Sequence, residues 1–178
     1  DIVGVDRAQE SDLGLWVVDT LGTHPRQVVG VSARMPSWQP ERNRLAFIRR
    51  VDTNMETYQV ALLDMGTGVV DTLTSQPYPW GSRYPVWSPD GRRIAYCADT
   101  NGLNNALSGI WIVTPDTKET IHIPKAASST LTYVAGVCWS PDGTRLVYSG
   151  HNADTNTYTL HMRNLDGTND TVLTVPDP

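Results

Sequence analysis

Several features that would identify common protein classes are missing from this sequence of 178 residues. No apolar run approaches the roughly 20 residues that a membrane-spanning helix needs, so we expect no membrane insertion by this chain. Positive charge is scattered, since only Arg49-Arg50 and Arg92-Arg93 stand together, and the net charge is −5. A surface that binds phosphates needs clustered Lys or Arg, so a nucleic-acid partner is not expected either.

The motifs of common catalytic sites are also missing. The sequence contains no Gly-x-Ser-x-Gly nucleophile elbow and no glycine-rich phosphate loop after a strand. Histidine is present without metal-ligand spacing. We expect ordinary surface or strand residues at His24, His122, His151 and His161. The sequence therefore predicts a protein that is not an enzyme, with no catalytic residue in this chain.

Cysteine is scarce and gives little information about the compartment. Cys97 and Cys138 are the two cysteines, and neither has the spacing of a metal ligand. We expect two packed thiols, although a disulfide between them remains open. The first methionine is Met35, so we also expect that Asp1 is not a translation start.

What the sequence does contain is a repeat. Its copies are Trp38-Gln39-Pro40-Glu41, Trp87-Ser88-Pro89-Asp90-Gly91 and Trp139-Ser140-Pro141-Asp142-Gly143. The tryptophans are 49 residues apart (38 to 87) and 52 residues apart (87 to 139), and an Arg follows each one at plus six, before an apolar run. A period of about 40–50 residues with four strand signals and no helical one is typical of a β-propeller blade.

The repeat also defines the expected domain organisation. We expect an all-β propeller built of four-stranded antiparallel blades, with an incomplete blade at 1–33 and blades at 34–82, 83–134 and 135–178. The first unit lacks a Trp-Pro-acid strand, so the chain would hold about three and three-quarter blades. Propellers close with about four to eight blades. We therefore expect a larger propeller, for example six-bladed, or completion by another chain.

Residues 87–96 and 139–148 carry the Trp-Ser-Pro-Asp-Gly motif, and they resemble the WD40-like PD40 repeat of the TolB-type β-propellers. That repeat also occurs in the propeller domains of tricorn-like and prolyl-oligopeptidase-like peptidases. The resemblance covers nearly the whole chain and is more specific for fold than for function. It implies a periplasmic or extracellular location in a bacterium. The copy at Trp38 departs from the pattern, so we expect a different turn geometry there.

The residues of the motif have a structural explanation. Ser and Asp oxygens accept backbone N–H groups in a turn, Pro fixes φ, and Gly takes the left-handed position. The acid at plus three could also pair with the Arg at plus six. We therefore look for function in the loops at the opposite ends of the strands.

The connection at residues 76–85 is rich in aromatic residues and proline. Such stiff surfaces are enriched at interface hot spots. The candidate partner-binding residues are Tyr78, Trp80, Arg83 and Tyr84, with Tyr133 from the corresponding connection of the next blade. Alternatively, Trp80 and Tyr84 pack between blades.

The loops between the second and third strands share an Asp-Thr-Asn triplet. A ring of such oxygens could bind calcium, but Asp and Asn are also the usual residues of turns. The candidate ligands are Asp52, Asn54, Asp99, Asn101, Asp154 and Asn156. Apart from this calcium alternative, no cofactor is expected.

Together these observations predict a non-catalytic propeller scaffold that mediates protein–protein interaction, within a bacterial extracytoplasmic or envelope assembly as the resemblance implies. One alternative is an accessory or gating propeller of a prolyl-oligopeptidase-like or tricorn-like hydrolase whose catalytic domain lies outside this chain. The second alternative is a calcium-stabilised propeller.

Overall fold

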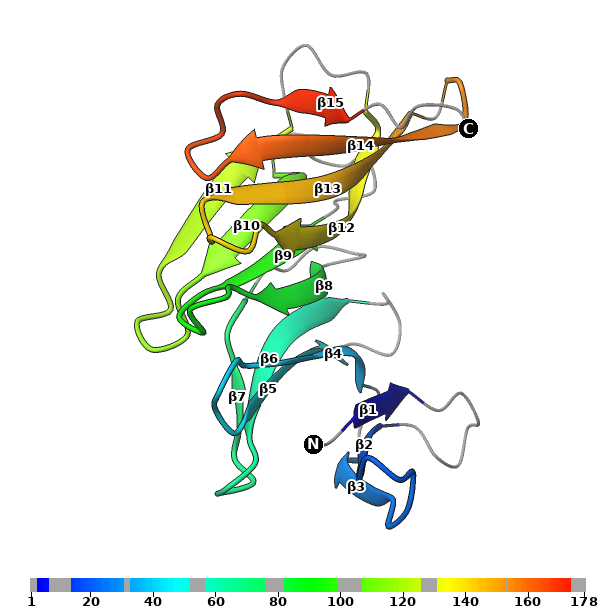
Figure 1. Ribbon diagram of the computed structural model, residues 1–178, viewed down its shortest axis with the longest axis vertical. Coiled ribbons are helices and arrows are strands. Elements are labelled where there is room, and N and C mark those ends of the chain that lie inside the picture. Colours follow the sequence, from blue (N-terminus) through cyan, green and yellow to red (C-terminus); the bar gives the residue numbers. More distant parts are fainter. Residues whose placement is uncertain are drawn as a thin grey trace.

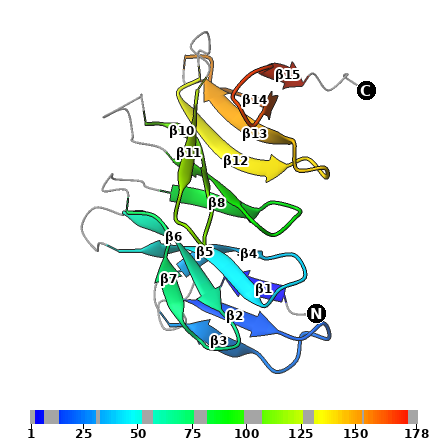
Figure 2. The same cartoon turned by 90° about the vertical axis from the view of Figure 1, so that its left-hand side faces the viewer.

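The structure is a computed structural model that describes residues 14–30, 33–51, 57–75, 82–98, 107–125, 131–152 and 154–173, together with the backbone of residues 3–6. These residues form four antiparallel sheets. The sheets follow one another along the long axis of the molecule (Figure 1), and the second view shows the same order (Figure 2). No helix in this part of the chain is long and apolar enough to cross a membrane.

The first sheet has three strands and the other three have four each. The first contains β1 (Val3–Asp6), β2 (Leu15–Val18) and β3 (Arg26–Val29). The second contains β4 (Ala33–Trp38), β5 (Arg44–Arg50), β6 (Tyr58–Asp64) and β7 (Val70–Thr72). The third contains β8 (Ser82–Trp87), β9 (Ile94–Ala98), β10 (Gly109–Val113) and β11 (Thr120–Pro124). The fourth contains β12 (Tyr133–Trp139), β13 (Arg145–Asn152), β14 (Thr157–Asn164) and β15 (Thr171–Leu173).

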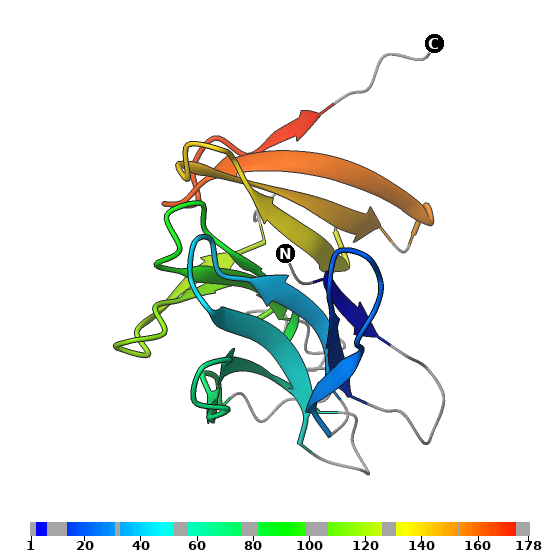
Figure 3. The same cartoon turned by 60° about the horizontal axis from the view of Figure 1, so that its bottom comes forward.

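Within each sheet, strands that follow one another in the sequence pair with one another. Each sheet is therefore an antiparallel meander, and the sheets fan out from one another (Figure 3). The prediction of an all-β propeller with four-stranded blades is confirmed. In such a meander the first-to-second and third-to-fourth connections lie at one end of the strands, here called the turn side. The remaining connections lie at the other end, the loop side.

The Trp-Ser-Pro-Asp-Gly turns have the expected chemistry. Ser88 Oγ donates to Asp90 Oδ1 at 2.5 Å and accepts from Arg93 N at 2.9 Å. Ser140 makes the same two bonds with Asp142 and Arg145, again at 2.5 and 2.9 Å. These bonds close the turn by satisfying backbone groups that would otherwise lack a partner.

The copy at Trp38 does have a different turn geometry, as predicted. Its left-handed residue is Glu41 (φ 56°), whereas Gly91 (φ 65°) takes that conformation one position later in its own copy. Gln39 fills the place of the serine and donates from Nε2 to Gly91 O at 2.5 Å. The second and third sheets are therefore joined through this turn.

The expected pairing of the motif acid with the Arg at plus six does not form among the described residues. Instead, the guanidinium of Arg44 lies over the ring of Trp87, 5.6 Å from its centroid, and Arg93 lies over Trp139 at 5.0 Å. Each Arg therefore contacts the tryptophan of the next sheet, where the electron-rich ring face attracts it.

The core consists of apolar clusters between neighbouring sheets. Leu15 and Phe47 belong to the cluster between the first and second sheets. Val60 and Tyr96 belong to the next, and Ile112 and Leu146 to the one between the third and fourth sheets. Burying a large apolar side chain in such a cluster contributes about 1.5–3 kcal/mol. A sheet with neighbours on both sides is therefore apolar on both faces, and all five residues of β9 are buried.

The two cysteines are free, so the disulfide left open by the sequence does not form. Cys97 is a packed thiol, as expected, and burial raises its pKa to about 12. Cys138 is exposed, so the expectation of packing was wrong for this residue. It lies on β12 in the fourth sheet, which has a described neighbouring sheet on one face only.

Candidate functional site

The first strands of the second, third and fourth sheets share an irregularity near their middle. Each has a register shift of the β-bulge type, in β4 between Arg34 and Ser37, in β8 between Arg83 and Val86, and in β12 between Ala135 and Val137. At each bulge one residue is left-handed, namely Met35 (φ 54°), Tyr84 (φ 55°) and Gly136 (φ 68°). All three stand three positions before the repeat tryptophan.

This conformation is costly for Met35 and Tyr84, because a residue with a Cβ loses roughly 1–2 kcal/mol in the left-handed region. Bulges re-aim side chains and are over-represented beside functional sites. Strained backbone likewise persists where the surrounding structure imposes it and is often part of a binding site. These bulged first strands, β4, β8 and β12, here called the inner strands, are therefore the first candidate site.

Three of the predicted partner-binding residues lie on these strands, while Tyr78 and Trp80 fall outside the described residues. Arg83 and Tyr84 belong to β8, and Tyr133 begins β12. β8 and β12 contact each other and both run from the loop side to the turn side. The structure therefore brings Arg83, Tyr84 and Tyr133 to the loop side of two neighbouring inner strands.

Their surroundings differ. Tyr84 is half-buried and packs against the core cluster between the third and fourth sheets, which is the packing role considered as its alternative. Tyr133 is half-buried and stacks on His151 with ring centroids 4.7 Å apart. Its hydroxyl lies 2.8 Å from the hydroxyl of Tyr158. Because Tyr158 is 61% exposed, this aromatic cluster extends from β12 to the surface at β14.

No sequence motif pointed to the other members of this aromatic cluster. His151 stands opposite Tyr133 and also opposite Tyr158 in the strand register. Cross-strand neighbours lie close enough for aromatic rings to touch. The cluster is therefore created by the pairing of β12, β13 and β14, and no local motif encodes it.

Two of the predicted metal ligands are described, and they lie in the connection between β13 and β14. Asp154 N donates to Asn152 Oδ1 at 2.9 Å. Asn156 is left-handed (φ 51°) and its Oδ1 lies 3.2 Å from His151 Nε2. Asp52, Asn54, Asp99 and Asn101 lie outside the described residues. Within the described part of the chain, no group of three or more His, Cys, Asp or Glu side chains is arranged to hold a metal ion.

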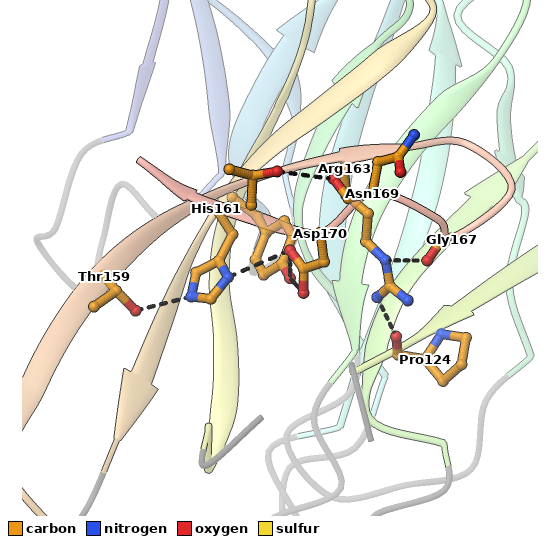
Figure 4. A network of polar contacts seen from close by, with 9 residues as sticks. Pro124, Thr159, His161, Arg163, Gly167, Asn169 and Asp170 are labelled. Carbon is orange, nitrogen blue, oxygen red and sulfur yellow. Dashed lines mark hydrogen bonds and ion pairs between the residues drawn. The ribbon is translucent and has the colours of Figure 1, made fainter. Parts of the chain in front are cut away.

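A polar network that sequence reasoning missed lies in the fourth sheet (Figure 4). His161 Nδ1 lies 3.3 Å from Asp170 Oδ1, and its Nε2 lies 2.9 Å from Thr159 Oγ1. Tyr148 stacks on the imidazole and donates from its hydroxyl to both Asp170 oxygens at 2.9 Å. Burial, followed by the hydrogen bond to Asp170, raises the pKa of Tyr148 above its usual value.

Thr159, His161 and Asp170 place a hydroxyl, an imidazole and a carboxylate in the order that is used to activate nucleophiles. The position of this network in the fold, however, points to packing. Tyr148 belongs to the core cluster between the third and fourth sheets. Nearby, Arg163 donates to Gly167 O at 2.7 Å and to Pro124 O in β11 at 2.5 Å (Figure 4). Tyr148 and Arg163 therefore both connect the fourth sheet to the third. We assign the network a structural role, since buried polar groups need such partners.

The carboxylates of the turn side are held in their ionised form. Hydrogen bonds from Ser140 and Thr144 lower the pKa of Asp142 to about 2. The bond from Ser88, followed by the backbone N–H of Arg92, lowers the pKa of Asp90. An open pocket on this side is lined by Arg42, Asn43, Arg44, Asp64 and Asp116. Arg44 and Asp116 already pair across it at 3.1 Å, joining the second and third sheets.

Comparison with known proteins supports the fold. No protein-family model matches the sequence. The structure is similar to that of a putative TolB from Agrobacterium tumefaciens, with a TM-score of 0.78 and 19% identity, over 97% of this chain and 60% of that chain. The chain has a TolB-like β-propeller fold. An oligogalacturonate lyase in complex with manganese matches with a TM-score of 0.65 and 18% identity, over 92% of this chain and 48% of that one.

A relative among curated proteins is an uncharacterized peptidase, YuxL, of Bacillus subtilis. It is 28% identical over 119 residues, which make up 64% of this chain but 16% of the peptidase. The chain therefore spans a small part of that relative and about 60% of the TolB structure. At these identities the structural likeness shows the fold alone.

Proposed function

We propose that this chain is a non-catalytic β-propeller scaffold that binds another protein at the loop side of β8 and β12. The observation that carries the proposal is the left-handed backbone of Tyr84 in the bulge of β8 (φ 55°). Gly136 occupies the same repeat position in β12 without this strain, so the fold itself does not require a bulky residue there. Because the Tyr84 ring packs against the core cluster, the bulge acts by orienting β8, and the contact with a partner comes from the half-buried Arg83 beside it.

The neighbouring side chains have suitable chemistry. Tyrosine and arginine are enriched among interface hot spots because they combine a large contact area with hydrogen-bonding groups. Arg83 is half-buried on β8, and Tyr133 connects through its hydroxyl to the exposed Tyr158. A TolB-like fold is consistent with a periplasmic or extracellular bacterial setting, within an envelope assembly, and we include this setting in the proposal.

Photo-crosslinking tests the binding surface. A photoreactive amino acid would replace Arg83 in cells of the source organism, and a matched variant would carry it at Leu21. Leu21 is 84% exposed in the turn between β2 and β3, on the turn side. We expect a discrete crosslinked partner from position 83 that is weaker or missing at position 21. Equal crosslinking at both positions, or none at 83, would rule out the proposed surface.

The second candidate is an accessory or gating propeller of a hydrolase, and the match to the Bacillus subtilis peptidase favours it. An acylaminoacyl peptidase also shares the fold, with a TM-score of 0.56 over 90% of this chain. The complete open reading frame distinguishes the two candidates. A downstream α/β segment with a Gly-x-Ser-x-Gly elbow would support the hydrolase, and a reading frame without one would remove it.

A further inference from the structure

The inner strands of the second and third sheets share a sequence around their bulges. Arg34-Met35-Pro36 in β4 and Arg83-Tyr84-Pro85 in β8 each combine an arginine, a left-handed residue and a proline. In both strands the arginine is the last residue that pairs with the second strand before the register shifts. The fourth sheet has Ala135 and Gly136 at the first two of these positions. The arginine is therefore a feature of two neighbouring sheets and is not required by the repeat.

Strand pairing places these two arginines on either side of β8. Arg34 stands opposite Ile48, which pairs with Val60 of the core cluster between the second and third sheets. Arg83 stands opposite Cys97 of the core cluster between the third and fourth sheets. Residues directly opposite each other on two strands lie on the same face of a sheet. Each arginine therefore stands at the loop-side end of the cluster that separates its sheet from the next one.

The charged residues of the second and third sheets are unevenly distributed between the two sides. In the described part of these sheets, Asp and Glu occur only on the turn side, where basic residues accompany them. On the loop side the described Asp, Glu, Lys and Arg residues are all basic, namely Arg34, Arg49, Arg50, Arg83 and Lys125. Arg34 is exposed and Arg83 is half-buried. The described loop side of these sheets is therefore basic, and it attracts negatively charged groups.

The geometry of the two arginines suits carboxylates carried by an extended segment. A guanidinium presents its N–H donors in a planar fork that matches a carboxylate. Packed sheets lie roughly 10 Å apart, which corresponds to about three residues of an extended chain. Nucleic acid would also bring negative charge, but its affinity depends on clustered basic residues that neutralise many phosphates, and this chain has a net charge of −5. An acidic protein segment is therefore favoured over nucleic acid.

We propose that the loop side of the second and third sheets, centred on Arg34 and Arg83, recognises an acidic segment of a partner protein. The proposal rests on the proposed function, because it names the kind of sequence that binds there. It also extends the binding surface from β8 and β12 to Arg34 on β4. Pairing with the second strand holds the backbone of each arginine in place beside its bulge, so less conformational freedom is lost on binding.

Fluorescence anisotropy with a labelled hexaglutamate peptide and the complete natural polypeptide tests this recognition. We expect binding that weakens as the salt concentration rises, because salt screens exposed charges. Arg34→Gln and Arg83→Gln should each raise Kd about two- to fivefold, as for exposed ion pairs, and the double variant about tenfold. Arg92→Gln is the matched control, since it removes an exposed arginine on the turn side of the third sheet, and it should leave Kd unchanged.

The photo-crosslinking variant at position 83 gives the second measurement, because it keeps Arg34. Adding Arg34→Gln should lower the yield of crosslinked partner about two- to fivefold, whereas adding Arg92→Gln should not change it. A crosslinked partner whose yield does not respond to Arg34→Gln would refute the acidic segment and leave the binding surface in place. No crosslink at position 83 with Arg34 present would remove the proposed surface, and this inference with it.

The peptide experiment can also overturn the proposal. If hexaglutamate does not bind, acidic residues of the connecting loops, such as Asp52, Glu56 and Asp99, already neutralise the arginines. An equal rise in Kd for Arg92→Gln would show a general response to net charge. Tighter binding of a hexathymidylate strand than of hexaglutamate, weakened by the same two substitutions, would identify nucleic acid as the ligand of this surface.

Discussion

Replacing Gly136 by alanine tests the description of the inner-strand bulges with little steric disturbance. Gly136 is left-handed (φ 68°), and an added Cβ would meet Ser149 Oγ at 3.8 Å, which is an ordinary contact. The cost is therefore conformational, at roughly 1–2 kcal/mol for a residue with a Cβ in this region. Alanine also restricts the unfolded chain, which offsets about 0.4–1 kcal/mol. We expect a net loss of about 0.5–1 kcal/mol in the free energy of unfolding.

Gly30→Ala is the matched control. Gly30 is not left-handed, and apart from its chain neighbours no atom of the described residues lies within 4 Å of its added Cβ. We therefore expect this variant to gain about 0.4–1 kcal/mol through the unfolded state alone. Urea denaturation of both variants, with unchanged slopes, gives the two free energies. If Gly136→Ala proves as stable as Gly30→Ala, the left-handed bulge does not exist and the account of β12 is wrong.

Three other predictions concern charge and metal binding. The Asp142 carboxyl, with its pKa lowered to about 2, should titrate below its ordinary value of 3.8 in an NMR experiment, and Ser140→Ala should raise its pKa because Ser140 is the main donor. The ionised Asp142 carboxylate then contributes to the free energy of unfolding above pH 3.8, and this contribution is lost as the pH falls through about 2. A pKa near 3.8 in the intact chain would contradict the turn geometry. Burial lowers the pKa of His122 from 6.5, because it disfavours the charged imidazole. The contribution of the neutral imidazole to the free energy of unfolding is therefore present above pH 6.5 and lost as the pH falls through the lowered pKa. The variant His122→Phe can keep the stack on Trp111, so its Tm should fall less between about pH 7 and 5 than the Tm of the parent chain. An equal fall in Tm would refute this explanation. EDTA should leave Tm unchanged because Asn156 Oδ1 already contacts His151, whereas a drop restored by calcium would support the calcium-stabilised alternative.

The strands could be predicted because the repeat tryptophans set a common register. The apolar run that follows each plus-six Arg lies within the second strand of its sheet, in β5, β9 or β13. Gly91 and Gly143 of the motif turns take the left-handed conformation that the sequence predicts. Local chemistry was sufficient for these features, since turns and strands depend mainly on neighbouring residues.

The candidate site was harder to predict because its geometry depends on strand pairing. Met35 and Tyr84 are not turn residues, so only the glycine at position 136 signalled a left-handed bulge in this part of the repeat. His161 and Asp170 lie on and beside different strands, and they meet only when β14 pairs with β15. The exposure of Cys138 was missed for a related reason, since it depends on whether another sheet covers its own.

Hydrogen exchange in the complex with the crosslinked partner would test the central claim of protein binding most directly. We expect the partner to slow exchange at the loop side of β8 and β12, around residues 82–84 and 133–135. The turns at residues 65–68, 114–118 and 165–168 should exchange as in the free chain. Protection confined to those turns, with no change at the loop side, would contradict the proposed binding surface.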